Sequence, residues 1–115
     1  MGVNASRIGQ LTDARDGVWS TGLSHHNAKG IIMATFMDVH DGFVGVTREQ
    51  LEAAHAADLA IEGDEGVHFE RAWLDPESGK VFCLSTGPSK EAVMRIHERA
   101  GHPTDQVFEL PIEVV

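Results

Sequence analysis

Histidine side chains and one cysteine recur along the last two thirds of this chain, at positions that folding could bring together. They are His40, His55, His68, Cys83, His97 and His102. Imidazole nitrogen and thiolate sulfur are donors that borderline transition metals prefer, whereas Mg²⁺ and Ca²⁺ prefer oxygen. The same side chains can also transfer protons as general acids and bases. These residue types therefore indicate either a transition-metal site or an acid–base centre.

The bulk composition narrows the class of protein. A chain of 115 residues supports one domain, and its formal net charge of −9 argues against nucleic acid as a partner, because phosphate binding needs clustered basic residues. No apolar run approaches the length that spans a bilayer, and a single cysteine excludes an internal disulfide. We therefore expect a soluble, cytoplasmic protein without membrane contact.

The first thirty residues differ from the rest of the chain. They are rich in Gly, Asn, Ser, Thr and Asp and show no sustained hydrophobic period. We expect an irregular N-terminal arm over 1–30, which could join the protein to a larger assembly, and a compact domain over 31–115. Within the arm, the adjacent His25 and His26 are expected in a solvated loop.

Hydrophobic spacing and end signals predict the first half of the compact domain. The apolar, β-branched stretch 31–39, with His40 at its end, predicts a strand. Thr47 and Gln50 form a capping box that predicts a helix ending near Glu62, with Gly63 as its C-cap.

The second half of the domain is predicted to contain three strands and one helix. Strands are predicted over 67–74 and 80–85, joined by the hairpin loop 75–79. Ser89 is expected to cap a second helix that Gly101 ends, and a last strand is predicted over 107–115, where Pro111 indicates an edge or a bulge. The order β-α-β-β-α-β predicts a ferredoxin-like α+β fold with a four-stranded antiparallel sheet in the order 4-1-3-2.

This topology would gather the candidate donors. The end of strand 1, the starts of strands 3 and 4 and the end of the second helix meet at one edge of the sheet. That edge would hold His40, Cys83, His97 and His102, and His55 would lie about two turns into the helix that starts there. Asp58 shares a helix face with His55 and could bond its ring, as carboxylates do for metal-bound histidines. The pattern leaves open whether His40 faces the helices or the open side of the sheet.

Each candidate also has an ordinary structural interpretation. His97 could be a helix C-terminal cation, and Cys83 could be a small buried hydrophobe. His68 and His102 are expected at the surface. No H-E-x-x-H, paired C-x-x-C or nucleophile-elbow motif is present.

Several segments together resemble a known family, the small nickel-binding, nickel-responsive ferredoxin-like proteins of actinobacteria. They are 36–41 (FMDVHD), 51–58 (LEAAHAAD), 81–84 (VFCL), 91–93 (EAV), 96–97 (IH) and 101–103 (GHP). The resemblance covers roughly residues 33–115. It implies a homodimer of ferredoxin-like subunits with histidine-rich nickel sites, whose ligands by matching position are His40, His55, Cys83 and His97, with Asp58 as a weaker candidate.

Three functions follow as hypotheses. The first is a homodimeric protein that binds nickel, or another divalent transition metal, for buffering, storage or sensing. The second is a dimeric α/β-barrel enzyme that uses His40 or His55 as a general base, which requires an apolar pocket with few converging ligands. The third is an interaction module that docks through residues 1–30 and in which the histidines are incidental.

Overall fold

The computed structural model describes residues 25–26 and 32–115. The chain divides into two compact units, one of residues 36–109 and one of residues 1–35 with 110–115. The expected arm over 1–30 lies almost wholly outside the described residues, so its irregular structure stays a prediction. No helix in the described part of the chain is long and apolar enough to cross a membrane.

The order of the main helices and strands is the one that the sequence predicts, with one strand added. The main elements are β2 (Ile32–His40), α1 (Arg48–Ile61), β3 (His68–Asp75), β4 (Lys80–Gly87), α2 (Lys90–Ala100) and β5 (Gln106–Glu109). The strands run in the order β5-β2-β4-β3, and β2 pairs with β5 and β3 with β4 in antiparallel orientation. This is the predicted ferredoxin-like sheet. The addition is β1 (His25–His26), a two-residue strand that pairs with Met33 and Ile32 where we expected a loop.

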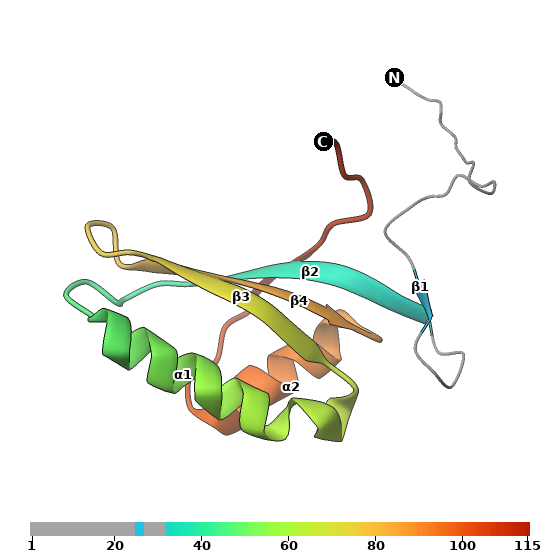
Figure 1. Cartoon of the computed structure of the whole chain (residues 1–115), viewed down its shortest axis with the longest axis horizontal. Helices are drawn as coiled ribbons and strands as arrows, with labels where there is room; N and C mark the ends of the chain where they lie inside the picture. Colours follow the sequence, from blue (N-terminus) through green and yellow to red (C-terminus); the bar gives the residue numbers. More distant parts are fainter. Residues whose placement is uncertain (1–24, 27–31) are drawn as a thin grey trace. The chain divides into compact units, whose positions relative to one another are not determined.

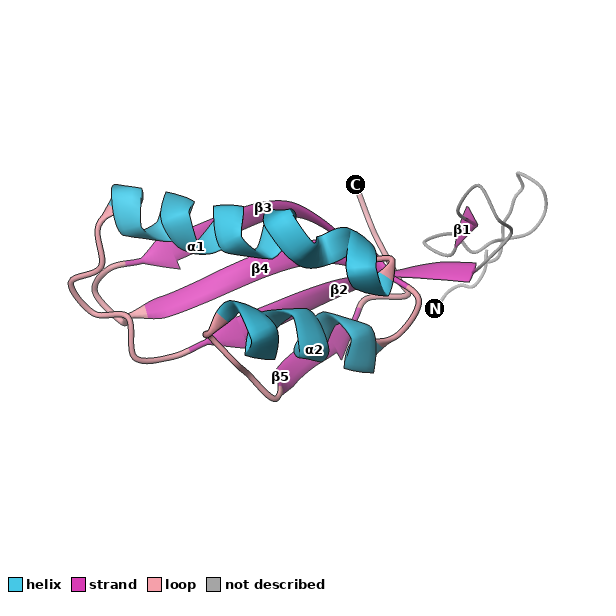
Figure 2. Cartoon of the chain, turned by 90° about the horizontal axis from the view of Figure 1, so that it is seen from below, coloured by secondary structure: helices cyan, strands magenta, loops and turns pink. Residues whose placement is uncertain are grey.

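Both helices lie on the same face of the sheet (Figures 1 and 2). Figure 2 shows α1 running beside β3 and β4, and α2 running beside β2 and β5. Strand alternation turns Phe36, Asp38 and His40 of β2 and Cys83 of β4 toward this helix-covered face, where all four are buried. His40 therefore faces the helices, which answers the question that the sequence left open.

Local capping chemistry explains where the helices begin. Thr47 accepts a hydrogen bond from the backbone N–H of Gln50, and the Gln50 side chain accepts one from the Thr47 N–H, which completes the capping box. Ser89 caps α2 through the Ala92 N–H, and Gly101 ends it in the left-handed region.

One predicted helix cap and one predicted strand end are wrong. α1 ends at Ile61, close to the predicted Glu62, but Gly63 is not its C-cap. The chain continues through a 3₁₀ turn, η1 (Glu62–Glu65), and turns only at Gly66, whose φ is 69°. The last strand stops at Glu109 and does not reach residue 115. The Leu110 N–H still donates to the Thr35 carbonyl, but Pro111 has no N–H to continue the ladder.

Candidate metal centre

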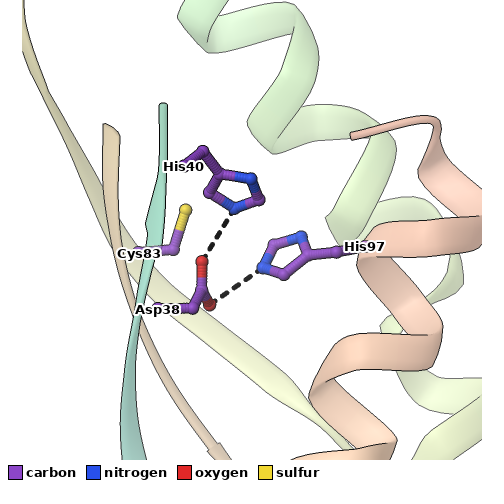
Figure 3. Close-up of side chains that lie close together, drawn as sticks. All are labelled: Asp38, His40, Cys83 and His97. Atoms are coloured by element: carbon purple, nitrogen blue, oxygen red, sulfur yellow. Dashed lines mark hydrogen bonds and ion pairs between the residues drawn. The ribbon is translucent and has the colours of Figure 1, made fainter. Parts of the chain in front are cut away.

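Four buried side chains from three elements meet beneath the helices (Figure 3). They are Asp38 and His40 of β2, Cys83 of β4 and His97 of α2, and one ligand atom from each lies within 4.8 Å of the others. Ligand bonds of about 2.0–2.3 Å hold two ligands of one ion no more than about 4.6 Å apart. The spacing of this donor group is therefore close to that of ligands around a single metal ion.

The contact between Asp38 and His40 is unusual for two buried polar groups. His40 Nε2 lies 2.8 Å from Asp38 Oδ1, yet the two atoms are not aligned as a hydrogen bond. Neither of these atoms, nor His40 Nδ1, has a hydrogen-bond partner within the described residues. Since an unpaired buried polar atom costs about 1–3 kcal/mol, such atoms in one place fit a site built for a cation.

His97 joins this donor group to a second one. Its Nε2 atom lies 2.9 Å from Asp38 Oδ2 and its Nδ1 atom 3.1 Å from Asp58 Oδ1. His102 Nε2 in turn donates to the same Asp58 oxygen at 2.9 Å. Asp58, His97 and His102 thus form a second group with metal-ligand spacing, which shares His97 with the first. Asp58 is not a member of the first group, but its contact with Nδ1 of His97 is placed to orient this ring, as carboxylates orient metal-bound histidines.

Burial and charge set the protonation of these groups. Burial would lower the pKa of His97, but the carboxylates of Asp38 and Asp58 raise it to about 9. Burial would raise the pKa values of both carboxyls, but His40 and His97 lower that of Asp38, and His102 and His97 lower that of Asp58. Burial and the two negative carboxylates raise the pKa of the Cys83 thiol. Without a metal, His97 is an imidazolium held between two carboxylates.

The structure brings together three of the residues that the sequence indicated as ligands, namely His40, Cys83 and His97. It adds Asp38, which we did not predict as a ligand although it lies two residues before His40 on the same strand face. Asp58 is buried, and within the described residues it bonds His97 and His102, whereas we expected it to bond His55.

His55 belongs to neither donor group in the described structure, and its role as a ligand stays a prediction. His97 lies in the last turn of α2, as the helix C-terminal interpretation requires, but it is fully buried between two carboxylates. His102, expected at the surface, is half-buried and hydrogen-bonded.

A cavity adjoins the donor group on the side of α1. Its walls include the apolar residues Phe43, Val46 and Leu51, and its polar lining includes His40, His55 and Cys83. A pocket is what the enzyme hypothesis requires. Here, however, many potential ligands converge on it, which favours the metal hypothesis over an acid–base site.

Fold and site together define a class of protein, a ferredoxin-like domain with a buried cluster of carboxylate, imidazole and thiol groups. Residues 36–110 match the family model of the nickel responsive protein SCO4226-like family, and the chain belongs to this family. The chain is also similar to SCO4226 from Streptomyces coelicolor A3(2), whose crystal structure it matches with a TM-score of 0.69. The identity is 60%, over 70% of this chain and 100% of that one. Comparison with curated proteins gives no match.

Proposed function

We propose that the protein binds one divalent transition metal ion, nickel first among them, through Asp38, His40, Cys83 and His97, and that it buffers, stores or senses this metal. The observation that carries the proposal is the convergence of four buried donors, two of which hold atoms without hydrogen-bond partners in the described residues. The membership of a family named as nickel-responsive supports nickel as the metal.

The chemistry of the donors also supports a borderline metal. One carboxylate oxygen, two imidazole nitrogens and one thiolate sulfur suit Ni²⁺, Zn²⁺ or Cu²⁺ better than the hard cations Mg²⁺ and Ca²⁺. With Asp38 and Cys83 both ionised, the two ligand charges balance those of a divalent ion. A buried site of this kind gains from such neutrality, because an uncompensated charge in the interior is costly.

Native mass spectrometry of the full chain with Ni²⁺, Zn²⁺ or Cu²⁺ tests the proposal. We expect the wild type to retain one ion per chain at the site and His40→Ala to lose it. His68→Ala is the matched control, because His68 is an exposed histidine outside both groups. A wild type that retains no metal stoichiometrically, or a His40→Ala variant that retains as much as the wild type, contradicts the proposal.

We further propose that the protein is a homodimer that pairs through the open face of its sheet. Strand alternation turns Trp73 and its cross-strand partner Phe82 to this face, together with Met37 and its partner Phe108. Trp73 is 44% exposed and Phe108 54% exposed. Large apolar side chains exposed on one face of a sheet are typical of an interface. A second copy of the chain fits it because a two-fold axis pairs like patch with like patch.

Size-exclusion chromatography with light scattering measures the mass of the protein in solution and so tests the proposed homodimer. The wild type is expected at the mass of two chains, Trp73→Glu at the mass of one, and Trp73→Phe at the mass of two. A monomeric wild type contradicts the homodimer. Cytoplasmic location and a larger assembly joined through residues 1–30 remain further proposals, which follow from the single cysteine and from the composition of the arm.

A further inference from the structure

The cavity beside the donor group approaches it from one side only. Its lining includes His40 and Cys83 but neither Asp38 nor His97. The remaining wall comes from the loop after β2, from α1, and from β3 and β4. Phe43, Val46 and Ala54 are among its apolar residues, and Asp58 and His102 are among its polar ones. The space therefore leads to the proposed metal site past two of its four ligands.

The size and polarity of the cavity restrict what can enter. Its volume is about 370 Å³ with its open mouth included, which is at the lower end of small-molecule pockets. Its enclosed part has room for about two water molecules, so even a five-membered ring that enters it extends into the open mouth. Apolar walls make the transfer of an anion from water costly, and a neutral molecule is favoured.

His55 supplies a further polar group to this space. It lies on α1, lines the cavity and makes no hydrogen bond to the described part of the chain. A ligand that places one nitrogen near His40 and Cys83 can direct a second polar atom to His55. A small heterocycle with two nitrogen atoms meets both requirements.

We propose that this cavity admits a small neutral nitrogen heterocycle, of the size of imidazole, to a position on the bound metal that the protein ligands leave open. This proposal rests on the proposed function, because the metal must be bound first. Ions such as Ni²⁺ and Co²⁺ accept more than four ligands, so an ion held by the four protein donors would have room for a further ligand. The protein would then bind its metal together with an exogenous ligand.

The test uses the full chain loaded with Co²⁺, whose visible absorption changes with coordination number. Native mass spectrometry first establishes one cobalt per chain, with and without imidazole. Imidazole is then titrated against the wild type, Ala54→Phe and Ala53→Phe. Ala54 lines the cavity, whereas its neighbour Ala53 is exposed on the same helix and lines no part of it. We expect a saturable spectral change in the wild type and in Ala53→Phe, and loss of that change in Ala54→Phe with the cobalt retained.

If Ala54→Phe does not fold, Val46→Phe fills the same cavity from the loop and is expected to lose the response in the same way. A cobalt-loaded wild type that does not respond to imidazole overturns the proposal. So does a filled-cavity variant that keeps its cobalt and responds as the wild type does. A wild type that binds no cobalt, nickel or zinc overturns the proposed function itself, which the mass measurement reports separately.

Discussion

His40 Nε2 lies 2.8 Å from Asp38 Oδ1 in the buried centre of the protein, without the alignment of a hydrogen bond. An imidazole nitrogen and a carboxylate oxygen at this distance need a proton or a cation between them, and a bound metal ion would supply the cation. The two side chains come from one face of β2, two residues apart, so the strand itself fixes their approach. This relationship is the structural basis for assigning Asp38 to the metal site.

Substitutions of Asp38 and Asp58 are expected to distinguish a direct metal ligand from a residue that only orients a ligand. Asp38→Asn should abolish stoichiometric nickel binding, because it removes a ligand charge. Asp58→Asn should weaken affinity by about 10–100-fold, because it removes only the group that orients His97. Competition titration against a chromophoric chelator measures both. Asp64→Asn, at an exposed carboxylate, is the control. If Asp58→Asn binds nickel more weakly than Asp38→Asn does, the roles assigned to the two carboxylates are reversed.

Metal binding is expected to release protons. Below pH 9, the His97 ring carries a proton on the nitrogen that faces Asp38, and the raised pKa of the Cys83 thiol keeps it protonated. Both protons must leave before these atoms bind an ion, so binding should release roughly two protons per metal. Calorimetry in buffers of different ionisation enthalpy counts them. Affinity should rise with pH, and an affinity that is independent of pH between 6 and 8 would rule out His97 and Cys83 as ligands.

The stability of the metal-free protein should fall at alkaline pH. The folded pKa of His97, about 9, lies above its ordinary value of 6.5. The resulting stabilisation is present in full below pH 6.5 and is lost as pH rises through 9. The difference corresponds to about 3 kcal/mol. The lowered pKa values of Asp38 and Asp58 act in the opposite sense, and their contribution is lost as pH falls below about 4.

Urea unfolding in the presence of a chelator should therefore show greatest stability between about pH 4 and 6.5. His68→Asn should keep the same profile, because that histidine is exposed. Stability that increases from pH 6.5 to 9 would contradict the charged state assigned to His97.

Two glycines near the loop after β2 provide a matched test of its packing. Gly79 and Gly45 both have positive φ, 75° and 84°. A Cβ on Gly79 would lie 2.5 Å from the Val44 backbone nitrogen, whereas one on Gly45 would contact nothing within 4 Å. Gly45→Ala should cost about 1 kcal/mol for its backbone conformation, and Gly79→Ala should cost clearly more. Thermal unfolding compares them, and equal costs would show that the contact with Val44 relaxes freely.

The fold was predictable because local signals mark its elements. The Thr47–Gln50 capping box, the Ser89 cap and the glycine at 101 lie where the structure has helix ends. The errors arose where local signals compete. Gly63 is a plausible helix cap, but it lies inside the four-residue 3₁₀ turn Glu62–Glu65, and Gly66 supplies the left-handed residue instead. Pro111 indicated an edge, yet its missing N–H ends the ladder.

The site was predictable only in part, because hydrophobic periodicity indicates which face of a helix or strand a residue occupies but not its distance from residues on other elements. Periodicity placed His55 on the inward face of α1 together with Asp58. Both residues line the cavity, but Asp58, which lies about 4.5 Å further along the helix, is the one that reaches His97. Asp38 was overlooked because aspartate is usually exposed, and its burial depends on groups distant in sequence, among them His97.

Nickel K-edge X-ray absorption of the wild type and of Cys83→Ser tests whether the metal is bound at this buried site. We expect one nickel per chain with a single sulfur scatterer among nitrogen and oxygen ligands in the wild type, and no sulfur scatterer in the variant. A nickel ion surrounded only by nitrogen and oxygen in the wild type would contradict a buried site formed by Asp38, His40, Cys83 and His97.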